Sequence, residues 1–284
     1  MIEHLSQYIS YIEQINQRSI SSKFIYRGEN DEKYMLLPSV YRRLNESGMN
    51  ASIYLTEYSE KYIIQQFIAE ASIHAGVPPT DDYFTWLEYA QHYGVPTRLL
   101  DWTSNPLVAL FFACYRPNEK NGKINILHYS SYKEVSEKKN RNYLKEKSLK
   151  QSVVDMIWNG SKEFPYPLVF HPYYLDRRMS AQSSLFMVWG NRVQTLNEMV
   201  AEIENDGRGH ELRLVKTNDE ESLVCEETSA LEVITIPADA KAQLLRELDN
   251  VGINYGTLFP GLDGIGKTVE WRMNIQNNQQ FMKL

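Results

Sequence analysis

The sequence has little cysteine, no long hydrophobic run and no excess of positive charge. Its 284 residues contain two cysteines, Cys114 and Cys225, which lie far apart and outside any CxxC spacing. This distribution disfavours a disulfide framework or a zinc site, so we interpret both as reduced thiols of a cytoplasmic protein. The longest apolar run, residues 106–115, is about half of what spans a bilayer. Because the N-terminus is also polar and unlike a signal peptide, we expect no membrane partner.

Basic residues are outnumbered by acidic ones. Lys plus Arg is 30 against 36 Asp plus Glu, which gives a formal charge of −6 and a pI near 5.6. This balance disfavours a surface built for nucleic-acid backbones or anionic membranes, while a local basic pocket remains compatible with it. The histidines show no HxxxH or HExxH spacing, so we expect no metal site. We interpret His128 and His171 as core histidines on apolar strands.

The apolar pattern predicts both helices and strands. Helical spacing, caps and proline boundaries predict helices over residues 2–17, 52–74, from Asp81 or Asp82 to His92, 106–115, 238–251 and after Pro260. Runs of strand-forming residues predict strands over residues 24–28, 123–129, 168–171, 184–189 and 231–236. No repeat or linker is visible. We therefore predict one α+β domain with a mixed or antiparallel central sheet flanked by several helices.

Four segments have no simple pattern. Residues 36–40 are predicted to be irregular, because Pro38 interrupts both a helix and a strand. Residues 130–150 are dense in Lys, Glu and Asn and predict a solvated, mobile insertion with some helix. Residues 204–229 predict a hairpin or loop. The glycines of residues 261–266 lack phosphate-loop spacing, and we interpret them as a turn into the last helix.

The densest group of unusual residues lies between residues 88 and 113. Arg98, Asp101 and Trp102 follow a polar helix end and precede an apolar helix. Charged and aromatic side chains crowded beside a hydrophobic helix favour a functional site. A structural interpretation is that Arg98 pairs with Asp101 and that the helix is capped by Asp101, Thr103, Ser104 or Asn105.

Two other segments contribute arginines. Arg27 ends an apolar strand, where an arginine either pairs with an internal acid or presents its guanidinium to a carboxylate or phosphate. The adjacent Gly28 permits close backbone approach. Arg178 and Gln182 lead into a later strand. They suit recognition of amide or hydroxyl groups, or they are simply surface residues.

Taken together, these segments resemble the FRG domain family, which is named for a Phe-Arg-Gly motif. The motif reads Tyr26-Arg27-Gly28 here, and a long second block runs from His92 to Ala113. A third block, Arg178 to Phe186, has Ser184 in place of the usual glycine, and a closing block covers residues 236–264. The resemblance implies an FRG domain over residues 20–270. We expect a packed helix at 1–19, the polar insertion near 130–150 within the domain, and a tail at 271–284.

The order of these motifs is similar to the plan of ADP-ribosyltransferases, and this similarity implies a fold and a chemistry of that type. In the comparison Arg27 holds a phosphate of NAD, Thr103 and Ser104 support the nicotinamide ribose, and Gln182 stands where a catalytic glutamate is expected. Glycosidic cleavage needs a carboxylate near the ribose, and a glutamine cannot ionise. Asp101, Glu88 or Glu270 would then take that role, or the domain is catalytically silent.

The residues and the resemblance together predict one cleft, with Arg27, Asp101, Thr103 and Gln182 as its catalytic residues. The expected ligand is a small anionic nucleotide, with NAD as substrate and no permanently bound cofactor. The expected biological role is a toxin or phage-defence effector that modifies a protein or nucleic acid. The alternatives are a non-catalytic binding module in the same cleft and a buried polar network that only stabilises the fold. The predicted ligand-binding residues are Tyr26, Gly28, His92, Tyr93, Thr97, Arg98, Trp102, Ser104 and Arg178.

Overall fold

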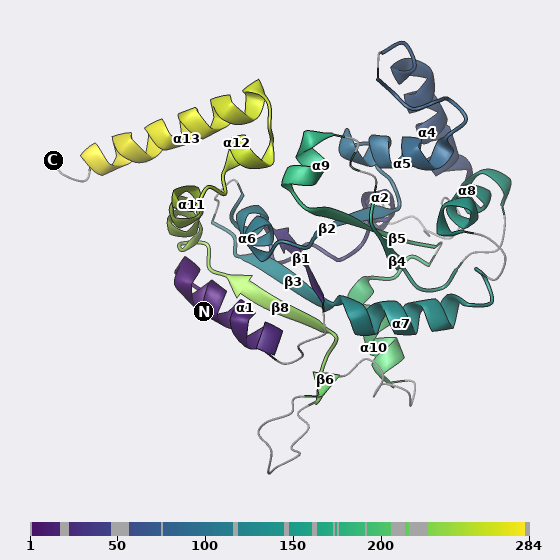
Figure 1. The fold of residues 1–284 in the computed structure, drawn as a ribbon, viewed down its shortest axis with the longest axis horizontal. Coiled ribbons are helices and arrows are strands. Elements are labelled where there is room, and N and C mark those ends of the chain that lie inside the picture. The colour runs from purple at the N-terminus through teal and green to yellow at the C-terminus, as the bar shows by residue number, and fades with distance from the viewer. Residues whose placement is uncertain are drawn as a thin grey trace.

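An antiparallel sheet of six strands lies at the centre of the protein, in the order β4-β5-β2-β1-β3-β8 (Figure 1). The structure is a computed structural model that describes residues 2–17, 23–46, 57–74, 76–115, 119–144, 148–160, 164–172, 174, 176–190, 192–205, 214–215 and 227–281. The strands of this sheet are β1 (Phe24–Glu29), β2 (Leu99–Thr103), β3 (Gly122–His128), β4 (Leu168–Phe170), β5 (Ser184–Val188) and β8 (Leu231–Ile236). The predicted α+β domain and its five predicted strands are confirmed, and β2 is an addition.

Helices surround this sheet. The predicted helices are confirmed as α1 (Leu5–Gln17), α4 (Glu57–Ala71), α5 (Tyr83–His92), α6 (Pro106–Cys114), α11 (Lys241–Asn250) and α13 (Leu262–Phe281). The structure adds α2 (Ser39–Glu46), α7 (Tyr129–Asn140), α8 (Leu149–Asn159), α9 (Arg177–Ala181), α10 (Leu196–Asn205) and α12 (Tyr255–Leu258). Helix α13 projects away from the rest of the protein and includes residue 271, the predicted start of the tail (Figure 1).

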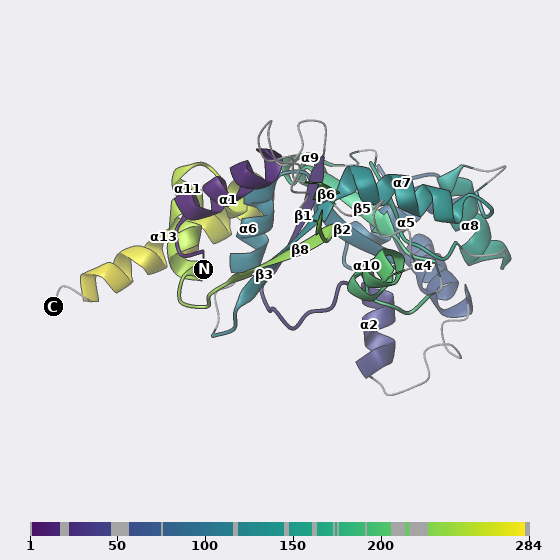
Figure 2. The same cartoon turned by 90° about the horizontal axis from the view of Figure 1, so that it is seen from below.

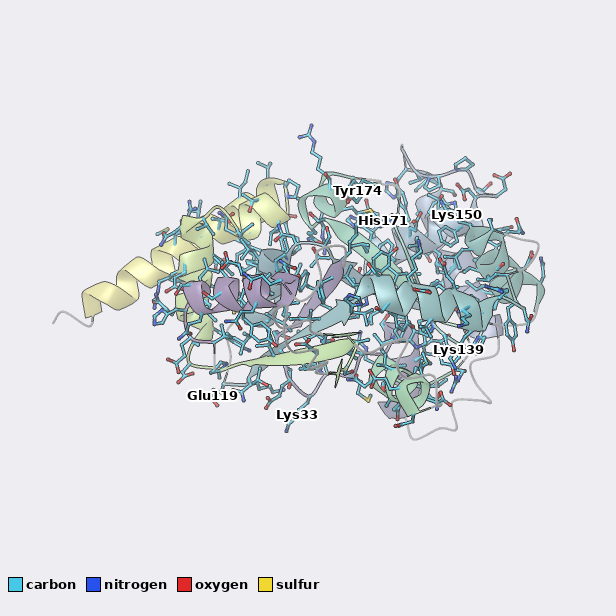
Figure 3. All side chains as sticks on the ribbon, turned by 60° about the horizontal axis from the view of Figure 1, so that its bottom comes forward. Lys33, Glu119, Lys139, Lys150, His171 and Tyr174 are labelled. Atoms are coloured by element: carbon cyan, nitrogen blue, oxygen red, sulfur yellow. The ribbon has the colours of Figure 1, made fainter. Side chains whose placement is uncertain are left out.

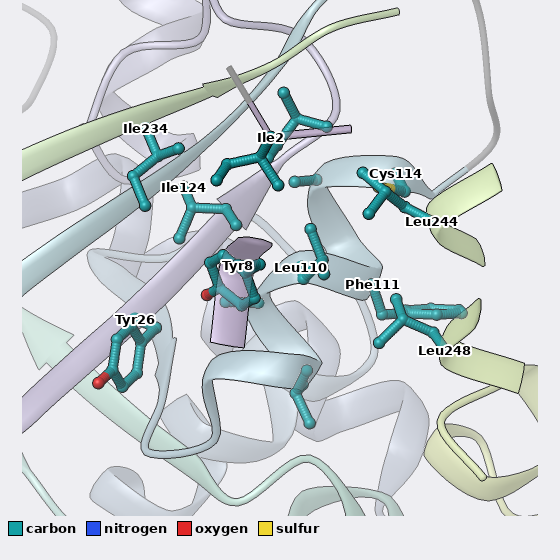
Figure 4. Close-up of a cluster of buried hydrophobic side chains, with 14 of the residues drawn as sticks. Ile2, Tyr8, Tyr26, Leu110, Phe111, Cys114, Ile124, Ile234, Leu244 and Leu248 are labelled. Carbon is teal, nitrogen blue, oxygen red and sulfur yellow. The ribbon is translucent and has the colours of Figure 1, made fainter. Parts of the chain in front are cut away.

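The two faces of the sheet contact different apolar clusters, because successive strand residues point to opposite sides. On one face, Tyr26 and Ile124 pack with α1, α6 and α11 in the cluster of Figure 4. On the same face, Phe186 packs with α4, α5 and α8 in a second cluster. Ile25 and Met187 lie on the opposite face with α2, α7 and α10, of which α2 and α10 are seen below the sheet in Figure 2. The first face therefore holds two neighbouring clusters.

Helix α6 packs on the sheet at two glycines. A Cβ atom on Gly28 would come 1.8 Å from the carbonyl oxygen of Ala109, and one on Gly122 would come 2.3 Å from that of Ala113. A glycine at each position allows the helix backbone to approach the strands this closely. The Arg-Gly pair in β1 therefore has a packing role at Gly28, beside any role of the arginine.

The insertion predicted over residues 130–150 contains helix, as expected, but its solvated character is wrong for part of α7. Helix α7 forms there, and its Tyr132 and Val135 are buried against the sheet. The Tyr132 hydroxyl donates to the carbonyl oxygen of Pro167 at 2.9 Å, and the Asn140 amide donates to that of Tyr166 at 2.8 Å. The high density of charged residues masked a helical face that is tied to the segment before β4. Residues 145–147 lie outside the described ranges.

Residues 36–40 and 204–229 are the other two segments predicted to be irregular or looped, and the structure differs from the first prediction. The segment 36–40 is only partly irregular, because α2 begins at Ser39, directly after Pro38. In the region 204–229, strands β6 (Leu214–Val215) and β7 (Glu227–Thr228) pair antiparallel, in agreement with a hairpin. The remaining residues from 206 to 226 lie outside the description.

One of the two cysteines lies in the described part of the chain. Cys114 is a free, buried thiol at the end of α6, and burial raises its pKa to about 12. Cys225 lies outside the described residues. Within the described ranges, no helix has both the length and the apolar character needed to cross a membrane.

Candidate functional site

A cavity of about 260 Å³ lies on the sheet face that holds the two clusters. Its apolar lining includes Tyr26, Val108, Phe112 and Phe186. Its polar lining includes Arg27, Gln91, His92, Asp101, Arg178 and Gln182. An apolar pocket with a few converging polar groups is the usual form of a small-molecule site, and this volume is slightly below the typical range for drug-sized ligands. The cavity therefore suits a compact ligand or one end of a longer one.

Strands β1 and β2 meet at the cavity and are joined by one register pair, Tyr26 with Thr103. Beyond this pair the Arg27 guanidinium connects the two strands. Its Nη1 donates to the main-chain oxygen of Asp101 at 2.7 Å and lies 3.9 Å from the Asp101 carboxylate. The Arg27 side chain is 15% exposed, whereas the Asp101 side chain is 57% exposed. A positive and a negative group thus lie side by side at the cavity.

Behind Arg27, a buried polar group holds the guanidinium in place. Its Nε donates to Glu29 at 3.2 Å, and Glu29 in turn accepts a 3.1 Å hydrogen bond from Asn125. Lys123 Nζ lies 3.5 Å from the same carboxylate, which is 2% exposed. Arg27 therefore combines two features expected from the sequence. Its side chain pairs with an internal acid, and it also lines the cavity.

Asp101 is oriented by a chain of hydrogen bonds from α5. Gln91 Nε2 donates to Asp101 Oδ2 at 2.7 Å, and the Thr97 hydroxyl donates to Gln91 Oε1 at 2.6 Å. The backbone N–H of Leu99 donates to the Thr97 hydroxyl oxygen at 3.1 Å. Because Thr97 accepts from Leu99, its proton is directed to the Gln91 oxygen, and this fixes the amide with its nitrogen toward Asp101. Thr97 itself is buried and acts through Gln91.

The third wall is built by α9 and the turn after it. The side-chain Nε2 of Gln182 donates to the carbonyl oxygen of Leu258 at 3.0 Å. The main-chain oxygen of Gln182 accepts from the Thr103 hydroxyl at 2.7 Å. Ser183, the next residue, has a φ of 47°, in the left-handed region that non-glycine residues rarely adopt. The Arg178 guanidinium stacks 4.7 Å above the Phe259 ring. These contacts tie the cavity wall to α12.

His92 lies at the rim beside α9. Its Nε2 is 2.6 Å from the Asp176 carboxylate. Burial lowers the pKa of His92, and the opposing attraction of Asp176 only partly offsets this shift. The imidazole is therefore mainly neutral at pH 7, and Arg27 and Arg178 carry the positive charge of the cavity lining.

Several predicted site residues lie elsewhere, and Arg98 is the clearest correction. Its guanidinium Nε donates to Glu60 at 2.7 Å, its backbone N–H donates to the same carboxylate at 2.9 Å, and both side chains are 2% exposed or less. Arg98 therefore forms an ion pair in the core with Glu60 of α4. The interpretation in which Arg98 pairs with Asp101 is wrong. Tyr93 is exposed at the end of α5 and Ser104 is in the turn before α6, neither in the cavity lining.

The structure also locates the Trp102 side chain and identifies the residue that caps α6. Trp102 borders the cavity, but its side chain packs in the cluster on the opposite face of the sheet. The cap of α6 is Asn105, whose side-chain oxygen accepts from the N–H of Leu107 at 2.9 Å. The Thr103 hydroxyl accepts from the N–H of Asn105 at 3.0 Å and so supports the same turn. The capping interpretation thus holds for Asn105 and leaves Asp101 to the cavity.

Of the three carboxylates considered for a catalytic role, only one lies at the cavity among the described residues. Glu88 is fully buried on α5, outside the cavity lining, and burial raises its pKa to about 7. Glu270 lies on α13, and it too is outside the lining. Among the described residues, Asp101 is the carboxylate that lines the cavity.

The histidines outside the cavity fall into two environments. His128 is buried, caps α7 by accepting from the N–H of Ser131, and has its pKa lowered to about 4 by burial. His171 is exposed after β4, so its interpretation as a core residue is wrong (Figure 3). Across the described ranges, no group of His, Cys, Asp and Glu is arranged to hold a metal ion.

Sequence reasoning missed Gln91, Glu29 and Asn125 as parts of the site. Gln91 directly precedes the predicted His92, but its link to Asp101 depends on where α5 ends relative to β2. Glu29 follows the Arg-Gly pair by one residue, so the alternation of β1 could have placed it beside Arg27. Asn125 is opposite Arg27 in the register of β1 and β3, which no local pattern reveals.

The chain matches a known protein family over its N-terminal part. The FRG domain model matches residues 22–122, a span that includes Tyr26-Arg27-Gly28 and the segment from His92 through α6. Arg178 and Gln182 lie beyond this span. No curated protein and no solved structure matches the chain. The chain, with the motif in β1 packed against α6 at the cavity, is therefore an FRG domain-containing protein, with the domain over residues 22–122.

Proposed function

We propose that the cavity binds a nucleotide, with NAD as its substrate, and that the protein cleaves the bond between nicotinamide and ribose. The observation that carries the proposal is the Arg27 guanidinium beside the Asp101 carboxylate at a cavity with both polar and apolar lining. An arginine suits a phosphate, and a carboxylate suits a sugar that develops positive charge. Arg27 and Asp101 thus complement the negative charge of the phosphate and the positive charge that develops on the ribose.

Binding of an anionic ligand is supported by the charges in the lining. Arg27 is held by Glu29 and by the Asp101 backbone, so its guanidinium is fixed before a ligand arrives. Arg178 adds a second guanidinium on the wall built by α9. A fixed guanidinium loses less conformational entropy on binding than a mobile one. The overall charge of −6 also favours a compact ligand over a long polyanion.

The chemical step needs one carboxylate near the ribose. The bond between the ribose C1′ and the nicotinamide nitrogen breaks, and its electron pair leaves with nicotinamide. Asp101 stabilises the positive charge that develops on the ribose and accepts a proton from the attacking water, whose oxygen bonds to C1′. The products are nicotinamide, ADP-ribose and a proton. If a protein or nucleic-acid nucleophile replaces water, the same step transfers ADP-ribose to it.

A second candidate function is a binding module without turnover. Gln182, which the similarity to ADP-ribosyltransferases places where a catalytic glutamate is expected, is an amide whose nitrogen already donates to Leu258. In this alternative, Asp101 is held by Gln91 to accept hydrogen bonds from ligand hydroxyls. Binding without release of nicotinamide would favour this function.

The biological role follows from the chemistry. Unregulated consumption of NAD, or modification of essential targets, would stop the growth of the cell, which is the effect of a toxin or a defence effector. We therefore propose this role as well, and expression of the wild-type chain should arrest growth while Asp101→Asn should not. Equal growth with both chains at equal expression contradicts the role.

Calorimetric titration with NAD tests the site. We expect binding by the wild-type protein and at least a tenfold weaker affinity for Arg27→Met, which keeps the length of the side chain without its charge. Arg192→Met is the control, because this arginine pairs with Glu202 away from the cavity. Absence of NAD binding by the folded wild type, or equal affinity in both variants, contradicts the proposal. Thermal melts show whether each variant is folded.

A further inference from the structure

Three residues with hydroxyl side chains form a row across the middle of the sheet. Tyr26 of β1 lies opposite Thr103 of β2, and Thr103 lies opposite Ser184 of β5. Side chains that are directly opposite on neighbouring strands share one face of the sheet, and all three residues line the cavity. We define Tyr26, Thr103 and Ser184 as the hydroxyl row.

The middle hydroxyl of the row is used within the protein, whereas the outer two are not. The Thr103 hydroxyl donates to the main-chain oxygen of Gln182 and accepts from the N–H of Asn105. Among the described residues, neither the Tyr26 hydroxyl nor the Ser184 hydroxyl has a hydrogen-bond partner. Tyr26 is 3% exposed and Ser184 is 8% exposed. Buried hydroxyls are normally hydrogen-bonded, so these two are suited to partners on a ligand.

The Tyr26 side chain reaches from the apolar cluster to the cavity. Its ring packs with α1, α6 and α11, and its oxygen points away from the other labelled side chains of that cluster (Figure 4). Burial raises the pKa of Tyr26 to about 12, so the hydroxyl keeps its proton at neutral pH. It is therefore a neutral hydrogen-bond donor at the cavity.

Gln182 presents an acceptor from the wall beside Ser184. Because its Nε2 donates to the carbonyl oxygen of Leu258 at 3.0 Å, the end of the amide that remains is Oε1. Within the described ranges Oε1 has no hydrogen-bond partner, and Gln182 lines the cavity. Ser183 joins the two residues with a φ of 47°, in the left-handed region. Backbone strain of this kind is concentrated at ligand and active sites.

We propose that the hydroxyl row and Gln182 bind a primary carboxamide, the group that nicotinamide carries. The carboxamide lies over Thr103. Its oxygen accepts from the Tyr26 hydroxyl on the β1 side, and its NH2 group donates to Gln182 Oε1 and to the Ser184 hydroxyl on the β5 side. The oxygen and both N–H groups of the amide then each have a partner. This carboxamide subsite rests on the proposed function, because NAD brings nicotinamide to the cavity.

The neighbouring side chains fit the rest of the nicotinamide group. Asp101 precedes Thr103 by two residues on β2, so its side chain lies on the same face, one step along the strand. In NAD the ribose is bonded to the ring that carries the carboxamide. A carboxamide over Thr103 therefore allows the ribose to lie near Asp101, as the proposed reaction requires. Phe112 and Phe186 also line the cavity and offer aromatic side chains to the positively charged ring.

NMR titration with two free probes tests the carboxamide subsite without any turnover. Nicotinamide carries the amide, whereas the acetylpyridine with its substituent at the same ring position has the same carbonyl group but a methyl group in place of NH2. We expect the wild type to bind nicotinamide about tenfold more tightly, because only this probe donates to Gln182 and Ser184. Failure of the folded wild type to bind nicotinamide, or equal affinity for the two probes, overturns the subsite.

The partner of the carbonyl group is tested by Tyr26→Phe, which removes only the hydroxyl. We expect both probes to bind about fivefold more weakly. The melting temperature should be no lower than that of the wild type, since no hydrogen bond within the described protein is lost. Tyr89→Phe is the control, because the Tyr89 hydroxyl donates to Gly76 outside the cavity lining. Equal affinities in the two variants contradict the role of Tyr26.

Two variants of Gln182 separate its acceptor from its contact with the wall. Gln182→Met and Gln182→Glu both lose the hydrogen bond to Leu258, but Gln182→Glu keeps an oxygen that accepts from NH2. We expect Gln182→Met to reduce the preference for nicotinamide over the acetylpyridine about threefold or more, and Gln182→Glu to retain it. A preference in Gln182→Met equal to that of the wild type contradicts the role of Gln182.

The same experiments distinguish failure of the subsite from failure of the proposed reaction. If the two probes bind as expected but no nicotinamide is released from NAD, the subsite is supported and the reaction is contradicted. If nicotinamide is released from NAD by a protein that binds the two probes equally, the subsite alone is contradicted.

Discussion

Gln91 Nε2 donates a 2.7 Å hydrogen bond to Asp101 Oδ2, and the direction of this bond is fixed by Thr97 on the other side of the amide. An amide donor that faces a carboxylate holds the orientation of that carboxylate. Gln91 is therefore a positioning residue for the carboxylate at the cavity. The function proposed for Asp101 makes this relationship measurable.

Replacement of Gln91 should affect turnover more than folding. We expect Gln91→Ala to lower kcat for NAD cleavage about tenfold, because Asp101 loses its fixed orientation. Gln91→Glu replaces the amide donor by a carboxylate that repels Asp101, so we expect kcat to fall for this variant as well, with a melting temperature close to that of the wild type. A kcat equal to that of the wild type in both variants contradicts the positioning role.

The buried pair of Arg98 and Glu60 should stabilise the fold and not the ligand. Glu60→Gln leaves Arg98 without its charged partner in the core, so we expect a loss of about 3–5 kcal/mol in the free energy of unfolding. The control is Arg192→Gln, which removes a pair whose side chains are 30% and 50% exposed and should cost less than about 1 kcal/mol. Urea denaturation measures both, and equal effects would contradict the assignment of Arg98 to the core.

This pair shows what the sequence could and could not predict. The pattern of apolar residues around β1 and α6 predicts both elements and brings Arg27 and Asp101 to one region, because local periodicity and caps determine those elements. The partner of Arg98 is 38 residues away on α4, and no local signal distinguishes Glu60 from the other acids of the chain. In α7, charged residues hid the face that carries Tyr132, since burial there depends on contacts with the segment before β4.

The buried carboxyl of Glu88 should make the stability depend on pH. Its folded-state pKa is about 7, against an ordinary value of 4.5, so the folded state binds the proton more tightly than the unfolded state. The associated stability is complete below pH 4.5 and is lost as the pH rises through 7, by about 3 kcal/mol in total.

Glu88→Gln removes this titration. The unfolding free energy of the wild type should therefore fall relative to that of Glu88→Gln between pH 4.5 and pH 8, when both are measured by urea denaturation. Below pH 4.5 the difference should be constant. Parallel curves over the whole range would show that Glu88 does not titrate as its burial indicates.

Gly28 should be required for the packing of α6 on the sheet. A methyl group there would lie 1.8 Å from the Ala109 carbonyl oxygen, which is backbone and cannot rotate away. We expect Gly28→Ala to lower the unfolding free energy by about 3 kcal/mol or more. Gly261→Ala is the control, because a Cβ atom there meets nothing within 4 Å, and its effect should stay within about 0.5 kcal/mol. Equal stability of the two variants would contradict the close packing.

Nicotinamide release from NAD by the wild type and by Asp101→Asn tests the central claim most directly. The substitution keeps the size of the side chain and its ability to accept from Gln91 but removes the negative charge. We predict release by the wild type, at least a hundredfold slower release by Asp101→Asn, and NAD affinity and melting temperature in the variant close to those of the wild type. A folded wild type that binds NAD without releasing nicotinamide, or equal release by both proteins, would contradict it.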